Sequence, residues 1–229
     1  NGTNTSTGSS SNGNISGKVV LQFKPSDDIM LYGSYTRGYK GPAFNVFFNH
    51  VAPNNAVPID EETSNAFEVG FKSQFLDNRA QLNVSLFQVE YDGFQANNFI
   101  EVGTPPTVIS NLTNAGTVES KGFEADLLFV PTDGLTLRGS AAYADAKVKK
   151  FNPRPDNGAP DARNGTRLPL APKFTYTVGA DYERPLGGLT VYLATDYRHV
   201  GKQYSDLGEQ GLIDAYGQWN ASIGFSDAN

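Results

Sequence analysis

The stretch EETSNAFEVGFKSQFLDNRAQLNVSLF, residues 61–87, decides the fold. Its apolar side chains recur at every second position on either side of a polar triplet, at Phe67, Val69, Phe71, Phe75, Leu82, Val84 and Leu86. The positions between them are polar or small, namely Glu68, Gly70, Lys72, Gln74, Gln81, Asn83 and Ser85. A period of two predicts two antiparallel strands that turn at residues 77–79, with one apolar and one polar face. After residue 86 the apolar phase shifts to Phe87, Val89 and Tyr91, as a β-bulge or a strand leaving an apolar zone would produce.

The same alternation returns along the chain. Paired segments are predicted at 18–24 with 29–36, 123–129 with 135–143, and 174–182 with 189–197, followed by a single segment at 219–225. Short turns join the members of each pair, while long polar segments at 40–60, 95–114 and 147–172 separate the pairs. The pattern predicts an all-β, antiparallel, up-and-down sheet of about nine long strands, with short turns at one end and long loops at the other.

The solvent on each face must be inferred from other features, because a soluble sandwich also alternates. The predicted strands have roughly 10 to 14 residues, which is longer than in most soluble sheets. Aromatic residues lie near strand ends, as in an interfacial girdle, at Tyr35, Tyr39, Tyr91, Tyr143, Tyr182 and Tyr197. Together with the unequal loops, these features favour a transmembrane β-barrel of the outer membrane over a large soluble β-domain.

Composition excludes several classes of protein. The 229 residues carry a net charge of −6 and no run of basic residues, which argues against a nucleic-acid partner. Cysteine is absent, so disulfides and thiolate metal sites are excluded. No apolar run is long enough for a membrane-spanning helix. Residues 1–16 are rich in Asn, Thr, Ser and Gly and lack the pattern of a signal peptide, so they are expected to form a flexible loop segment.

Four segments carry a family resemblance. The segment EETSNAFEVGFKSQFLDNRAQLNVSLFQVEYDGFQ resembles the E-x-G-x-K strand, D-N-R turn and following strand of TonB-dependent outer-membrane receptors. MLYGSYTRGYKGPAFN, NAGTVESKGFEADLLFVPTDGLTLRGSAAYADAKV and LPLAPKFTYTVGADYE resemble three further landmarks of that family, in the right order. Together they cover most of residues 17–200 and match the carboxy-terminal half of the family's barrel.

The resemblance implies a larger protein than this chain. Residues 17–229 would be part of a 22-stranded barrel, with residues 1–16 in an extracellular loop, short periplasmic turns, and the plug domain and final strands absent from the chain. The location would be the outer membrane of a Gram-negative bacterium. Implied partners are outer-membrane lipid and lipopolysaccharide, the protein's own plug domain, the TonB complex through that plug, and a small-molecule substrate.

Two sets of residues are candidates for function. The barrel lumen is expected to be lined by Glu68, Lys72, Glu124, Asp126, Arg138, Asp181, Asp196 and Arg198. These charges would meet the plug or the permeation path, or simply pair across neighbouring strands. Ligand contact is expected from the first long loop, where aromatic residues adjoin cations, at Arg37, Tyr39, Lys40, Phe44, Phe47, Phe48 and His50. Packing of that loop on its neighbours would explain the same residues.

Two other loops are charged. KVKK at 147–150 with DARNGTR at 161–167, and DLGEQGLID at 206–214, are candidates for contact with substrate or lipopolysaccharide, or are solvated loops.

No enzyme motif is present, and no metal or cofactor site is expected. His50 and His199 are far apart in sequence and have no carboxylate at ligand spacing. The favoured hypothesis is TonB-coupled uptake of a scarce solute, such as an iron–siderophore or similar chelate, cobalamin or an oligosaccharide. The alternatives are a passive porin and, less favoured, a structural or adhesive β-domain.

Overall fold

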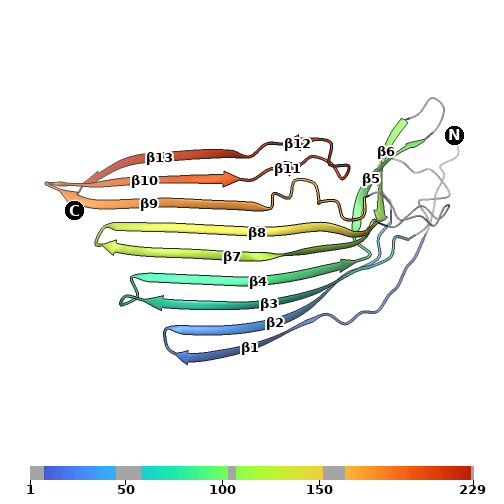
Figure 1. Ribbon diagram of the computed structural model, residues 1–229, viewed down its shortest axis with the longest axis horizontal. Helices are drawn as coiled ribbons and strands as arrows, with labels where there is room; N and C mark the ends of the chain where they lie inside the picture. Colours follow the sequence, from blue (N-terminus) through green and yellow to red (C-terminus); the bar gives the residue numbers. More distant parts are fainter. Residues whose placement is uncertain (1–7, 45–57, 103–106, 152–162, 228–229) are drawn as a thin grey trace.

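The computed structural model describes residues 8–44, 58–102, 107–151 and 163–227, and the side chains of 97–111 are not described. Nine strands form one antiparallel sheet in the order β1-β2-β3-β4-β7-β8-β9-β10-β13 (Figure 1). Their bounds are β1 Gly17–Ser26, β2 Ile29–Lys40, β3 Glu62–Phe75, β4 Ala80–Asp92, β7 Gly116–Thr132, β8 Leu135–Phe151, β9 Phe174–Leu186, β10 Leu189–Val200 and β13 Tyr216–Asp227. This confirms the predicted all-β, up-and-down architecture, and β1 and β13 are its two edges.

The two ends of the sheet differ. Short turns join β1 to β2, β3 to β4, β7 to β8 and β9 to β10 at one end, and long connections lie at the other (Figure 1). In the turn after β3, residues Leu76, Asp77 and Asn78 all have left-handed backbone angles, with φ of 56°, 54° and 63°. Asp and Asn tolerate this region better than most residues, which explains the polar turn seen in the sequence. Arg79 Nε also donates to the carbonyl of Val130, 2.9 Å away, and so links this turn to the end of β7.

The β3–β4 hairpin has an unbroken register from Thr63–Asp92 to Phe75–Ala80, and β4 pairs with β7 equally regularly. The shift of apolar phase after Leu86 is therefore not a β-bulge. Instead, one face of β4 changes from apolar side chains to Gln88 and Glu90, so the strand leaves an apolar zone. We call the face that carries Phe67 the outer face, and the face that carries Glu68 the inner face.

The outer face is apolar but unburied. Phe67 and Val69 are 58% and 55% exposed, whereas a soluble sheet would cover such a face with a second layer. Towards the long-loop end, aromatic side chains contact one another across and along the strands. The contacting pairs are Tyr35 with Phe67, Phe123 with Tyr143, Phe174 with Tyr176, and Tyr176 with Tyr197, with ring centroids 5.0–6.1 Å apart. This row of aromatic side chains matches the aromatic girdle expected at a membrane interface.

One residue assigned to the girdle from the sequence is misplaced. Tyr91 pairs with Ser64 and therefore lies on the inner face, where its ring contacts Phe94 at 6.1 Å. The other predicted girdle residues, among them Tyr35 and Tyr143, have outer-face register. The error arises because Tyr91 follows the phase shift, beyond which the inner face of β4 is the more apolar one.

The long connections contain more strand than the sequence indicated. Residues 95–114, expected to be a loop, form the hairpin β5 Gln95–Val102 and β6 Thr107–Asn114. A second small hairpin pairs β11 Gln203–Tyr204 with β12 Leu212–Ile213. Residues 147–150, expected to begin a loop, lie within β8. Among the described residues, no helix is long and apolar enough to cross a membrane.

Candidate functional site

The eight charges expected to line a lumen share one face of the sheet. Register relates Glu68 to Phe87, Phe87 to Gly122, and Asp126 to Ser140, and continues strand by strand to β10. All eight therefore have inner-face positions: Glu68, Lys72, Glu124, Asp126, Arg138, Asp181, Asp196 and Arg198. Whether they meet a plug or a permeating solute stays a prediction.

A compact cluster on the inner face joins β2 to β3. The Tyr32 ring lies across Gly70, where it occupies the space that a Cβ would need. Its hydroxyl donates to Glu68 Oε1, and Lys72 Nζ lies 5.7 Å from the ring centroid. Gly70 thus leaves space for the Tyr32 ring, which packs between the opposite charges of Glu68 and Lys72.

A hollow of about 490 Å³ lies further along the inner face. Its polar lining includes Asn83, Asp126, Arg138, Ser140, Thr177 and Asp196. Arg138 Nη2 binds Asp181 on the neighbouring strand at 2.7 and 2.9 Å, and Asn220 donates to Asp196 at 3.0 Å. Asn83 Oδ1 is buried without a hydrogen-bond partner among the described residues. The hollow is lined by charged and polar side chains and contains one buried acceptor without a partner among the described residues.

The predicted ligand-contact residues are divided by the structure. Arg37 and Tyr39 lie at outer-face positions on β2, and Arg37 Nη1 donates to Asn65 Oδ1 at 3.2 Å. Lys40 has inner-face register and faces Glu62 at 3.9 Å. Phe44 is half-buried beside the bridge between Ala43 and Ile59. Phe47, Phe48 and His50 lie outside the described residues, and the structure does not bring the four described members together at one place.

A hydrogen-bonded junction holds the base of the β5–β6 hairpin, and no pattern in the sequence predicted it. The Gln95 side chain is 6% exposed and donates to the carbonyls of Gly41 and Asp60, both at 2.9 Å. The Asn114 amide donates to the carbonyls of Asp60 and Gly93 at 2.9 and 2.7 Å. Because buried carbonyls need donors, this junction holds the hairpin against the ends of the first long loop.

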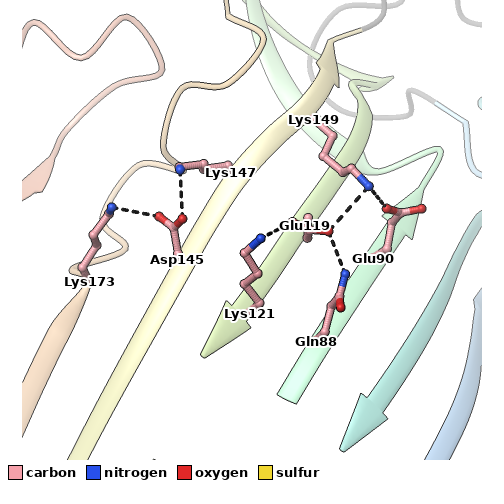
Figure 2. Close-up of polar contacts among 8 residues, drawn as sticks. All are labelled: Gln88, Glu90, Glu119, Lys121, Asp145, Lys147, Lys149 and Lys173. Carbon is pink, nitrogen blue, oxygen red and sulfur yellow. Dashed lines mark hydrogen bonds and ion pairs between the residues drawn. The ribbon is translucent and has the colours of Figure 1, made fainter. Parts of the chain in front are cut away.

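A second group of charges lies on the outer face, and from the sequence only its lysines at 147 and 149 were named, as part of a charged loop. By register it lies on the long-loop side of the aromatic girdle, on β4, β7, β8 and the residue before β9. Figure 2 shows its side chains. We call it the outer charged cluster, and its members are Gln88, Glu90, Glu119, Lys121, Asp145, Lys147, Lys149 and Lys173.

The cluster has two halves, one around Glu119 and one around Asp145. Glu119 accepts from Gln88 at 2.9 Å and faces Lys121 and Lys149, each at 3.5 Å, while Lys149 also contacts Glu90 (Figure 2). Asp145 lies 2.9 Å from Lys147 and 3.1 Å from Lys173. Partial burial alone would raise the pKa of Asp145, but hydrogen bonds and charge from the two lysines outweigh it and hold that pKa below its usual range.

A sequence signal for this cluster existed. Glu119 and Lys121, and likewise Asp145, Lys147 and Lys149, are two residues apart and so share a face. Their phase continues the apolar positions Phe123 and Tyr143, which identifies the outer face. The shared facing of these residues was missed because KVKK was assigned to a loop, whereas it lies within β8.

No metal centre is found in the described part of the chain, where no three His, Asp or Glu side chains are placed to hold an ion. His199 lies on the outer face and stacks on Tyr176, with centroids 5.0 Å apart.

The chain is similar to known outer-membrane receptors. The model of the family described as TonB dependent receptor-like, beta-barrel, matches residues 1–228. The probable TonB-dependent siderophore receptor PiuA of Acinetobacter baumannii is 26% identical over 88% of this chain and 26% of PiuA. The ferric-pyoverdine M114 receptor PbuA of a Pseudomonas species is 24% identical over 98% of this chain and 25% of PbuA. The chain thus spans about a quarter of the length of these relatives.

Solved structures have the same fold. The ferric yersiniabactin uptake receptor FyuA from Yersinia pestis superposes with a TM-score of 0.73 at 17% identity, covering 91% of this chain and 29% of FyuA. The PiuA structure gives 0.68 at 23% identity over 90% of this chain and 28% of PiuA. The nine-stranded sheet is therefore a portion of an outer-membrane β-barrel. The chain belongs to the TonB-dependent receptor-like β-barrel family.

Proposed function

We propose that this chain is part of a receptor that imports an iron–siderophore across the outer membrane with energy from TonB. The observation that carries the proposal is the family match over residues 1–228, together with curated relatives named as siderophore receptors. In this proposal residues 17–229 supply part of a larger barrel and residues 1–16 a flexible extracellular loop segment. The plug and the remaining strands would lie elsewhere in the receptor.

The inner face suits such a role. Its charges are of both signs and are distributed over β3, β7, β8, β9 and β10, so the wall stays hydrated and offers partners to a plug. The junction of Gln95 and Asn114 would hold the β5–β6 hairpin at the extracellular end, near Lys40 and Phe44. The ligand would be held by loops and plug together. No bond is made or broken, so no enzyme activity or cofactor is part of the proposal.

Further partners belong to the same proposal. The TonB complex would act through the plug, and the outer face would meet membrane lipid and lipopolysaccharide. A passive porin is the contrasting possibility, because it would share the strands but need no energy source.

Uptake measurements test the proposal. A strain that lacks this receptor should lose accumulation of at least one radiolabelled ferric siderophore, and a plasmid copy should restore it only when TonB is present. A panel that includes pyoverdine-type and ferrioxamine-type chelates would identify the substrate. Accumulation that is restored equally without TonB would contradict the proposal and favour a passive channel.

A further inference from the structure

A trough of small side chains runs along the inner face of β8 and β9. Its floor is formed by Ser140 and Ala142 on β8 and by Thr175, Thr177 and Gly179 on β9. Register pairs Ser140 with Thr177 and Ala142 with Thr175, so these side chains adjoin one another. The hollow of about 490 Å³ described above and another of about 300 Å³ are both lined by Ser140 and Thr177. The two hollows are therefore neighbouring parts of one trough.

Charged side chains form the two walls of the trough. On one side β7 contributes Glu124 and Asp126, which pair with small residues of β8. On the other side β10 contributes Asp196 and Arg198, which pair with small residues of β9. The two walls lie three strand spacings apart, which is about 14 Å. A solute in the trough thus has carboxylates on both sides.

The trough carries an excess of negative charge. The charge of Arg138 is offset by Asp181, whose oxygens lie 2.7 and 2.9 Å from its Nη2. Glu124 and Asp126 have no ion-pair partner in the described part of the chain, and there Arg198 is the lining cation that no carboxylate neutralises. The three lining carboxylates outnumber this cation by two. A hollow walled by protein concentrates such a field, so the trough attracts cations.

The trough is also rich in hydrogen-bond acceptors. Asn83 pairs with Asp126, and its buried Oδ1 has no partner among the residues that the structure describes. Asp196 accepts from Asn220 at 3.0 Å and has further lone pairs. Ionised carboxylates accept and do not donate, so these groups complement a ligand that donates. An ammonium group combines three N–H donors with a positive charge and so meets both requirements.

We propose that the trough is a subsite for an ammonium group of the imported solute. Asp126 is its central carboxylate, because it lines both hollows, and Glu124 and Asn83 supply further acceptors. The solutes favoured at this wall are chelates with amines at their periphery, and those with several free carboxylates or sulfonates are disfavoured. This inference rests on the proposed function, in which the solute passes along the inner face.

A single engineered thiol can report on the trough, because the chain has no cysteine. Ser140→Cys places the thiol on the floor, opposite Asp126. The probes are two methanethiosulfonate reagents, one with a trimethylammonium group and one with a sulfonate, applied to the purified full-length receptor without siderophore. The unsubstituted receptor gives the background. Relative to a free thiol in solution, the cationic reagent should be favoured at least about tenfold.

Removal of the carboxylates should remove this preference. In the S140C receptor, E124Q/D126N should lower the ratio of the two rates at least about fivefold. Neither carboxylate has an ion-pair partner within the described residues, so thermal unfolding should match that of the parent.

The matched control is E183Q/D227N, which removes the same charge from two exposed side chains outside both hollows. Along their strands these residues lie at least about 20 Å from the level of Ser140, beyond the screening length of about 10 Å at 0.1 M salt. The ratio should therefore stay within about twofold of the parent value.

Competition distinguishes binding from attraction alone. Spermidine, whose charged groups are all amines, should slow modification of the S140C thiol by the cationic reagent at least about twofold at millimolar concentration. Citrate at the same ionic strength should not slow it. The protection by spermidine should disappear in E124Q/D126N and persist in E183Q/D227N.

Four results would overturn the proposal. They are equal reactivity towards the two reagents, an equal loss of preference in E183Q/D227N, no protection by spermidine, and a thiol that neither reagent modifies because a folded plug closes the trough. The assay requires neither TonB nor uptake. A failed subsite with intact TonB-dependent uptake is therefore distinguishable from a failure of the transport proposal.

Discussion

The inner face and the outer charged cluster both mix acids and bases, but they are organised differently. On the inner face the ion pairs are local, as between Arg138 and Asp181, and Glu124 has no ion-pair partner among the described residues. In the outer charged cluster the single carboxylate of Glu119 contacts three side chains, those of Gln88, Lys121 and Lys149. A wall that must stay wet needs only scattered charge, whereas charges beside lipid must satisfy one another.

The largest expected effect tests the two faces themselves. Val69 lies within the apolar band on the outer face, so Val69→Arg should destabilise the fold in lipid by about 2–4 kcal/mol. Gln74→Arg, on the inner face of the same strand, should cost less than about 1 kcal/mol. Urea-dependent folding of the full receptor into liposomes measures both. Equal costs would mean that the faces are wrongly assigned.

The second prediction compares one carboxylate from each region. Glu119→Gln should reduce stability by about 1 kcal/mol, because three neighbouring side chains lose a shared anion. Glu124→Gln on the same strand should change stability by less than about 0.5 kcal/mol. Chemical unfolding of the two variants in parallel provides the measurement. A larger loss for Glu124 would show that the inner charges are the coupled ones.

The smallest effect is a pH dependence confined to the outer charged cluster. Lys147 and Lys173 hold the pKa of Asp145 below its usual range, so its folded-state pKa is lower than its unfolded one. The stabilisation is therefore fully present above the unfolded pKa, near pH 4, and is lost as pH falls through the folded pKa. Thermal unfolding of wild type should decline more steeply below pH 4 than that of Asp145→Asn. Parallel curves would contradict this coupling.

Much of the fold was predictable because lipid and water impose a strict period of two. The paired strands around residues 77–79, 131–134 and 184–188 were all identified from side-chain alternation. The β5–β6 hairpin was not, because its sequence lacks that alternation and its pairing lies outside the main sheet. Strand ends above the membrane have water on both sides, so β8 continues to Phe151 without an apolar signal.

The candidate site was predictable in part for the same reason. All eight inner charges could be assigned to a face because they alternate with apolar side chains within their own strands, and the register places them together. The junction at Gln95 depends on backbone carbonyls of Gly41 and Asp60, which are remote in sequence and leave no side-chain pattern. The outer charged cluster could not be recognised as one group from the sequence, because its contacts depend on the register between β4, β7 and β8.

The change from apolar to polar side chains on the outer face of β4 also marks a depth in the membrane. From Phe67 to Phe75 the outer apolar positions of β3 span about 27 Å along the strand, or about 20 Å along the membrane normal at a typical tilt. The length of this apolar band is matched to the hydrocarbon thickness of the bilayer, and this match determines how deep the protein lies in the membrane. Two residues added to β4 after Leu86 would raise Glu90 by about 7 Å and keep it facing the leaflet. One added residue would rotate it into the lumen, so depth and facing are both encoded by the same residue count.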